Sequence, residues 1–286
     1  MRLKEKVTER FIFIAGYSAI FFSLAIFYYI LKESLPFFQL YSLGEFITGN
    51  QWYPVSEPPK FGILPLLSGS FIVALFSSLI TIPAGLIVAV YISEIAPIWV
   101  RSFLKSSLEI LVGIPTVILG VVALYTLVPF LRTLFNIPTG LTALAGVLML
   151  SLMAIPTMAS LSEDSLSSIV PSLKENSLAL GATRWQTIRY ILIPSARSGI
   201  IAAALLSLGR VIGETMVVLM ITGNAPQITF SLLKPVRVLT ATIGAEMGEA
   251  VFGSAHYHVL FTLGLVLLIF STLINVTSYF LLGRKK

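Results

Sequence analysis

Arg210 and Glu214 are the two charged residues of this sequence that fall near the middle of a long apolar segment. A charged side chain at the centre of a membrane-spanning helix costs roughly 2.5 to 3.5 kcal/mol, so its presence needs an explanation. At a spacing of four residues the two share one helix face, and pairing would offset part of that cost. A planar guanidinium also binds oxyanions well, with a carboxylate nearby to orient or balance it. Two interpretations follow, a packing ion pair and a polar face on a translocation path.

Other residues with chemical potential give weaker signals. Gly209 and Gly213 form a small-xxx-small pair, which is more typical of close helix packing than of binding. His256 and His258 have no carboxylate at metal-ligand spacing apart from those of the GAEMGEA run at residues 244–250, so we expect them to be interfacial. That run resembles a short external helix of unclear function. The sequence contains no cysteine, which excludes disulfides and thiolate sites, and we expect neither a metal nor a cofactor.

The one polar stretch that a bilayer does not explain runs from Glu163 to Arg197. Ser172 and Glu175 have the spacing of a capping box, which predicts a helix from residue 173. Gly181 predicts a left-handed end to that helix. A pair of polar helices can lie in the headgroup layer without any partner, so this pattern alone leaves the function of the stretch open.

A second helix is predicted to follow the glycine turn. Thr183 and Gln186 repeat the capping-box spacing. Trp185 lies on the apolar face of this helix, which Pro194 is expected to stop after about residue 192. The stretch is therefore predicted to be helix, turn, helix.

Composition identifies the environment of the chain. Of its 286 residues, 56% are hydrophobic and only 11% are charged, whereas soluble proteins have about a quarter charged residues. Six segments are long enough to cross a hydrocarbon core of ~30 Å as helices. They cover approximately residues 11–31, 67–93, 108–131, 139–162, 198–222 and 257–282. The sequence therefore predicts an all-α, polytopic protein of the cell membrane.

These segments divide the chain into three parts. Residues 1–66 form a tail, the first helix and an external loop whose aromatic residues are expected at the interface. Residues 67–282 form a transmembrane core that contains the stretch 163–197, and residues 283–286 form a second tail. A signal peptide is the competing interpretation of the first helix, but the apolar run is long and no cleavage site follows it.

Positive residues predict the orientation. Thirteen Lys and Arg residues fall on the side of the termini and of the stretch 163–197, against five on the other side. The positive-inside rule therefore places both termini and this stretch in the cytoplasm. The net charge of +6 reflects this topology rather than nucleic-acid binding. No second copy of the polar stretch occurs in the chain.

The spacing of Glu175, Gly181 and residues 191–194 resembles the EAA loop of ABC-importer permeases. Asn176 and Ser177 replace the two alanines usual in that family, and Ile193 replaces its leucine. The resemblance implies a cytoplasmic coupling helix that docks into a groove on an ATP-hydrolysing subunit. The residues that the resemblance assigns to this contact are Glu175, Leu178, Gly181, Ala182 and Trp185.

Further segments are similar to the C-type permease of the bacterial and archaeal phosphate ABC importer, over nearly the whole chain from Trp52. They are residues 61–67, 155–157 with 161–164, 209–216, 223–228 and 239–250. The resemblance implies a type I ABC importer permease fold with six transmembrane helices. It also implies an A-type permease partner, two copies of an ATP-binding subunit and an extracytoplasmic phosphate-binding protein. Arg210 and Glu214 match the family's arginine and glutamate associated with phosphate passage.

The resulting hypothesis is a permease subunit of an ATP-driven phosphate importer, and not an enzyme. No Walker A pattern occurs, so ATP hydrolysis is expected in a separate chain. The alternatives are a permease for molybdate, tungstate or sulfate, the A-type phosphate permease, and a stand-alone secondary transporter, which has no use for an EAA loop. An intramembrane hydrolase is disfavoured, because Asp164 is the only aspartate and both histidines lie together at a loop edge.

Overall fold

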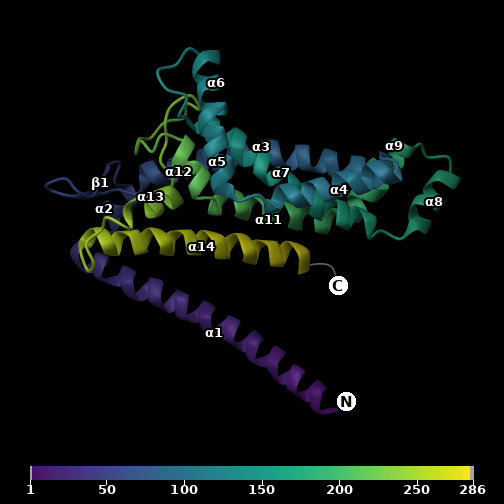
Figure 1. The fold of residues 1–286 in the computed structure, drawn as a ribbon, viewed down its shortest axis with the longest axis horizontal. Coiled ribbons are helices and arrows are strands. Elements are labelled where there is room, and N and C mark those ends of the chain that lie inside the picture. The colour runs from purple at the N-terminus through teal and green to yellow at the C-terminus, as the bar shows by residue number, and fades with distance from the viewer. Residues whose placement is uncertain (1, 284–286) are drawn as a thin grey trace.

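The computed structural model describes the backbone of residues 2–283 and the side chains of residues 8–277. The fold is helical, as predicted, with one short pair of strands (Figure 1). Within the described range, five helices are long and apolar enough to cross a membrane. A bent pair, Arg184–Ser195 with Arg197–Gly213, makes six if it is counted as one span. The basic residues expected to orient the chain ends, Arg2, Lys4, Lys6 and residues 284–286, lie outside the described side chains.

The N-terminal part is more ordered than the predicted loop. Helix α1 (Arg2–Leu40) continues well past residue 31, and α2 (Leu43–Thr48) follows it. Strands β1 (Trp52–Tyr53) and β2 (Lys60–Phe61) pair antiparallel. The Trp52 side chain is 1% exposed and packs in a cluster of aromatic residues, so it is part of the core rather than of an open loop. Its partners include Phe37, Phe46 and Phe61, which bury large apolar rings together.

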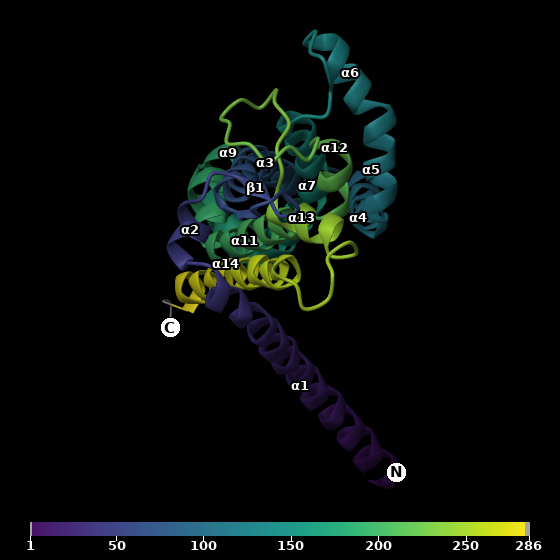
Figure 2. The same ribbon diagram turned by 90° about the vertical axis from the view of Figure 1, so that its left-hand side faces the viewer.

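The centre of the molecule is the contact between α3 (Leu64–Val90) and α7 (Ala143–Ser167), which pack along their lengths. Gly85 of α3 permits this approach, because a Cβ there would lie 2.5 Å from Met158 of α7. Proline is present inside both helices, as Pro83 and Pro156, and neither ends its helix. In Figure 2, α3, α7 and α11 lie together in the middle, with α14 beside them and α1 running outward.

The third apolar segment is not continuous over the predicted span of residues 108–131, because a break at residues 114–115 separates its start from the candidate span Thr116–Leu134. It is divided into α4 (Ile98–Gly113), α5 (Thr116–Tyr125) and α6 (Leu127–Leu134). Ile114 has extended backbone (φ −67°, ψ 128°) because the ring of Pro115 disfavours the helical conformation in the residue before it. Arg101 and Lys105, expected in a linker, therefore lie on a helix.

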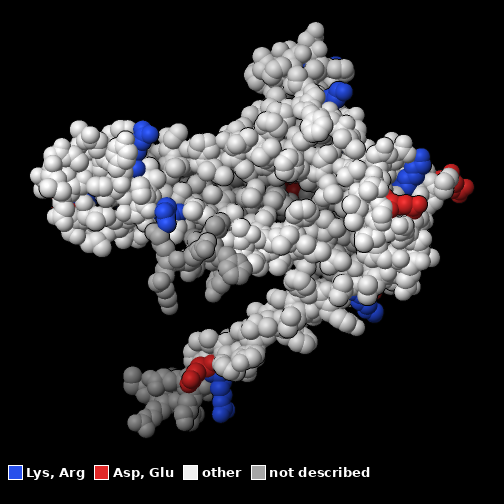
Figure 3. Space-filling view, turned by 180° about the vertical axis from the view of Figure 1, so that it is seen from behind, with Lys and Arg blue, Asp and Glu red and all other residues white. Residues whose placement is uncertain are grey.

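The remaining elements carry the candidate site. They are the π-helical turn η1 (Tyr91–Ile95), α8 (Pro171–Ala179), α9 (Arg184–Thr187), the π-helical turn η2 (Ile188–Leu192), α10 (Ile193–Ser195), α11 (Arg197–Gly213), α12 (Met216–Ile221), α13 (Leu239–Glu246) and α14 (Ala255–Gly283). The start of α1 and the end of α14 lie toward the same end of the long axis as α8 and α9, whereas α2 and β1 lie at the opposite end (Figure 1). Charged side chains gather toward these ends, and the middle of the face in Figure 3 is almost free of them.

Candidate functional site

Arg210 lies in the last turn of α11 and is held by α7. Its Nη1 donates a hydrogen bond to the hydroxyl oxygen of Thr157 at 2.8 Å, and both side chains are half-buried. Among the residues whose side chains are described, Arg210 has no other hydrogen bond and no carboxylate at ion-pair distance. With a rise of about 1.5 Å per residue, Arg210 lies roughly 20 Å along α11 from Arg197. The guanidinium is therefore deep in the bundle and has most of its donors unused.

Glu214 does not continue the helix that carries Arg210. Its backbone is extended (φ −69°, ψ 130°), and α11 ends one residue earlier. Its Oε1 accepts a hydrogen bond from the backbone N–H of Val217 at 3.3 Å, and Thr240 donates to its carbonyl oxygen at 2.8 Å. The expected pairing of Arg210 with Glu214 on one continuous helix face is wrong, because the helix breaks between α11 and α12. Broken backbone at membrane depth is tolerated where it is buried in protein or lines a cavity.

The glycine face of α11 borders a cavity. A Cβ added to Gly209 or Gly213 would meet no atom within 4 Å, so close helix packing of this face within the chain is not observed. Both glycines line a cavity of about 570 Å³ between α11, α14 and α1. Thr240 and Asn275 contribute polar groups to its wall. The small residues therefore leave space beside the segment that carries Arg210.

Helix α8 opens the polar stretch, and part of its predicted capping is wrong. The helix starts at Pro171 without a side-chain cap, so Ser172 and Glu175 do not form a capping box. Proline at the first helical position accounts for the start, since its missing N–H needs no partner there. Gly181 adopts the predicted left-handed conformation with φ +87°.

The second helix is capped as predicted but is longer. The Thr183 N–H donates to Gln186 Oε1 at 2.8 Å, and the Gln186 N–H donates back to Thr183 Oγ1 at 3.3 Å. The helix then passes through η2 and Pro194 to Ala196, where the chain bends by 71° into α11. The π-helical turn rearranges the hydrogen bonds ahead of Pro194, so the proline does not end the helix at residue 192.

The two short helices present an apolar surface. Trp185 is 61% exposed and Leu178 is 40% exposed, although both are large apolar side chains. Beneath them, the buried hydroxyls of Ser177 and Thr187 share a hydrogen bond of 3.0 Å that joins α8 to α9. Lys174 makes an ion pair of 2.5 Å with Glu94 of η1. These two contacts hold α8 in place beneath the exposed apolar surface.

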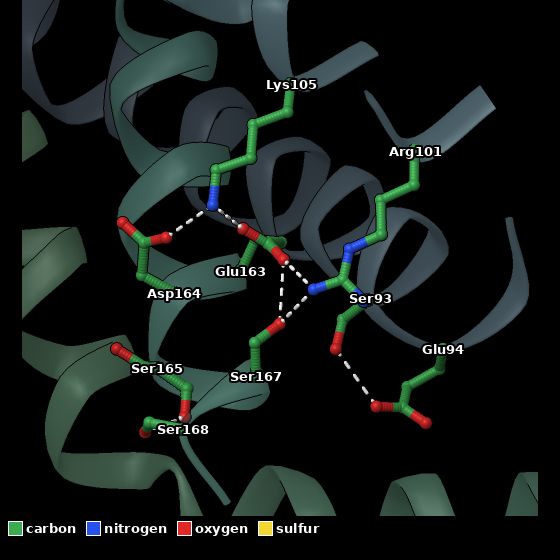
Figure 4. A network of polar contacts seen from close by, with 9 residues as sticks. All are labelled: Ser93, Glu94, Arg101, Lys105, Glu163, Asp164, Ser165, Ser167 and Ser168. Atoms are coloured by element: carbon green, nitrogen blue, oxygen red, sulfur yellow. Dashed lines mark hydrogen bonds and ion pairs between the residues drawn. The ribbon is translucent and has the colours of Figure 1, made fainter. Parts of the chain in front are cut away.

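A charged network joins α4 to the end of α7, and the sequence did not predict it (Figure 4). Glu163, whose side chain is 1% exposed, accepts from Arg101 at 2.6 Å and from Lys105 at 2.7 Å. Ser167 donates to the same carboxylate at 2.7 Å, and Lys105 also pairs with Asp164 at 2.7 Å. Hydrogen bonds to Asp164 and Glu163 raise the pKa of Lys105. The sequence does contain a signal for this network: Arg101 and Lys105 are four positions apart, as are Glu163 and Ser167, so each pair shares one helix face.

A second network joins four segments near the start of α14. Glu246 accepts from Trp52 Nε1 at 3.1 Å, from Arg237 Nη2 at 2.6 Å and from His256 Nε2 at 2.9 Å. His258 is likewise hydrogen-bonded, through Nδ1 to a backbone carbonyl oxygen of α1 at 2.8 Å. The two histidine side chains are 14% and 12% exposed, so both are held within the protein. The described residues contain no group of three or more potential metal ligands.

Comparison with known proteins adds relatives that cover most of the chain. A family model for the binding-protein-dependent transport system inner membrane component matches residues 81–284. The probable ABC transporter permease protein YqgH of Bacillus subtilis is 41% identical over 85% of this chain and 78% of its own. The phosphate transport system permease protein PstC of Mesorhizobium japonicum is 34% identical over 84% and 78%, respectively. The probable phosphate permease PstC of Methanocaldococcus jannaschii is 30% identical over 88% and 85%.

Solved structures share the arrangement of helices. A chain of a bacterial ABC transporter that imports alginate is 17% identical, has a TM-score of 0.67 and covers 100% of both chains. A chain of the inward-facing MetNI methionine ABC transporter is 24% identical, has a TM-score of 0.56 and covers 78% of this chain and 93% of its own. At these identities the likeness shows the fold alone, and it confirms the predicted type I ABC importer permease fold.

Proposed function

The chain belongs to the family of binding-protein-dependent transport system inner membrane components, and we propose that it forms one half of the path of an ATP-driven importer of inorganic phosphate. The observation that carries this proposal is Arg210, a deep guanidinium whose donors have one acceptor, Thr157, among the described side chains. An anion that passes this point meets a planar set of donors suited to oxyanions. The curated relatives named as phosphate permeases support phosphate as that anion.

Glu214 has a supporting part in this proposal. Its carboxylate caps α12 at the helix break, so it lies beside the path without neutralising Arg210. The broken backbone and the cavity along Gly209 and Gly213 supply space and polar groups at the same depth. We assign Arg210 the direct contact with phosphate and Glu214 the balance of charge around it.

The polar stretch is proposed to contact a separate ATP-binding subunit. Exposed Leu178 and Trp185 supply an apolar contact, and the turn at Gly181 and Ala182 sets the angle between the two helices. Glu175 is exposed on the same segment and offers a charge to the partner. ATP hydrolysis occurs in that partner, and two copies of it serve this chain and a second, A-type permease.

The proposed orientation rests on the positive-inside rule and on the arrangement of the elements. The proposed contact surface, the start of α1 and the end of α14 lie toward one end of the molecule (Figure 1), which fits a cytoplasmic location for all three. The opposite end, with α2, β1 and the Glu246 network, then faces an extracytoplasmic phosphate-binding protein. This arrangement puts phosphate delivery and ATP hydrolysis on opposite sides of Arg210.

Phosphate uptake by the complete transporter tests the proposal. Arg210→Gln is expected to lower uptake by at least about tenfold, since a hydrogen bond to a charged group contributes about 1.5–3 kcal/mol. Assembly with the partner subunits should remain normal. Arg132→Gln, which removes an exposed cation from α6, is the matched control and should leave uptake unchanged. Uptake of wild-type magnitude in Arg210→Gln would refute the pathway role.

Substrate choice is tested with the same preparation. Excess molybdate, tungstate or sulfate should leave the uptake of labelled phosphate unchanged, whereas unlabelled phosphate should suppress it. Suppression by one of the other oxyanions, together with uptake of that anion, would assign the transporter to it instead.

A further inference from the structure

Thr157 does not use its hydroxyl proton within its own helix, in contrast to several other hydroxyl residues of the fold. Ser151, Thr222 and Thr242 donate their hydroxyl protons to backbone carbonyl oxygens one turn earlier in their own helices. Thr157 makes no such bond in the described structure, and its one hydrogen bond is the one that it accepts from Arg210 at 2.8 Å. A hydroxyl has one proton to donate and two lone pairs to accept with. The Thr157 proton is therefore available while its oxygen holds the guanidinium.

The Thr157 hydroxyl lies beside a second group that can bind an anion, the guanidinium of Arg210. The half-buried hydroxyl lies next to a cation that has no counter-ion among the described side chains. By contrast, Arg101 and Arg237 of the same chain are each paired with a buried glutamate. A polar group removed from water is costly unless it is hydrogen-bonded, so an available O–H and several N–H donors together favour an acceptor that carries negative charge.

We propose that Thr157 and Arg210 form a joint contact for a tetrahedral oxyanion, in which the Thr157 oxygen orients the guanidinium and its proton is donated to the anion. This proposal rests on the proposed function, because it adds a second donor to the same path. The two donors project from different helices, α7 and α11. An anion that engages both therefore links the helices at mid-depth, which a single arginine does not do.

Substitutions at Thr157 in the complete transporter test the hydroxyl. Thr157→Val keeps the shape but removes the oxygen, and the maximal rate of phosphate uptake should fall about tenfold with assembly intact. Thr157→Ser should stay within about twofold of wild type. Thr222→Val is the matched control, since it removes a hydroxyl that already donates within its own helix, and it should also stay within about twofold. If Thr157→Val fails to assemble, Thr157→Ala makes the same prediction.

Direct contact with the anion is tested separately, because the chain has no cysteine. Thr157→Cys places one thiol at this position, and labelling of this chain by a small hydrophilic thiol reagent is measured by mass. Inorganic phosphate should slow the labelling at least about threefold during turnover, and chloride should not. Ser151→Cys, at a 2% exposed position of the same helix, should not be labelled.

The outcomes separate the two proposals. Normal uptake in Thr157→Val, equal loss in Thr157→Ser, or labelling of Thr157→Cys that is absent or insensitive to phosphate would each overturn the role of Thr157. Normal uptake in Arg210→Gln would instead overturn the proposed phosphate path. Reduced uptake in Arg210→Gln together with normal uptake in Thr157→Val would support the proposed phosphate path and would remove only Thr157 as its second donor.

Discussion

Neutralising Glu163 should loosen the contact between α4 and α7. Its carboxylate is 1% exposed and accepts hydrogen bonds from Arg101, Lys105 and Ser167 (Figure 4). Glu163→Gln keeps the size of the side chain but removes the charge that both cations share. One amide oxygen then replaces two carboxylate oxygens, so at least one of the two cations loses its bond to this side chain.

The expected loss lies between two limits. Removing one partner of a fully buried ion pair destabilises a protein by about 3–5 kcal/mol, whereas an exposed pair contributes about 0–1 kcal/mol. Arg101 and Lys105 are 39% and 37% exposed, so both can turn toward water, and each keeps a second partner. We therefore expect a loss of about 2 kcal/mol in the free energy of unfolding, or a factor of about 30 in the equilibrium.

The measurement is reversible unfolding of the purified protein in mixed detergent micelles, followed by helical circular dichroism. Asp164→Asn is the matched control, because Asp164 pairs with the same Lys105 but is 56% exposed. Its loss should stay below about 0.5 kcal/mol. Equal losses in the two variants would refute the reasoning, since burial of Glu163 is the property that is predicted to separate them.

Two further variants test other parts of the fold. Gly181→Val should uncouple ATP hydrolysis from uptake or weaken ATPase binding, because a backbone φ of +87° costs a β-branched residue about 1–2 kcal/mol. Gly181→Asn should have a milder effect. Equal activity in the two variants would remove the reason for assigning a role to this turn. Glu246→Gln should speed proteolysis of the segments that Glu246 joins, at β1 and at the start of α14, because Arg237 loses its carboxylate partner, and Glu249→Gln, at an exposed position, should not. Equal cleavage of the two glutamate variants would show that the Glu246 network does not hold these segments.

Hydropathy predicted the class and most of the spans, because the bilayer acts on every residue of a spanning helix in the same way. It did not predict the break at Glu214, which depends on α12 being capped locally and on Thr240 reaching its carbonyl oxygen. The break at Ile114 was readable from the following proline. The apolar run of residues 108–131 concealed it, since hydropathy does not report backbone angles.

The sequence identified a charged residue of the candidate site, but it did not identify the side chain that this residue contacts. Arg210 was identified because a charge in an apolar run stands out, whereas Thr157 is an ordinary residue of such a run. Its role depends on which side chain lies opposite it on α11, and only the packing of α7 against α11 determines that. The same limit applies to Trp52, whose burial depends on a cluster that includes Leu239, Leu260 and Leu263 from distant parts of the chain.

Helix α7 connects the two charged parts of the transmembrane core. Thr157 and Glu163 are six residues apart on it, or about 9 Å along the axis. Glu163 ties α7 to α4, while Thr157 ties it to α11. Helix α11 in turn follows the proposed ATPase contact after the 71° bend at Ala196. A movement of α11 at this bend would therefore change the hydrogen bond between Thr157 and Arg210, which is one of the contacts between α11 and α7.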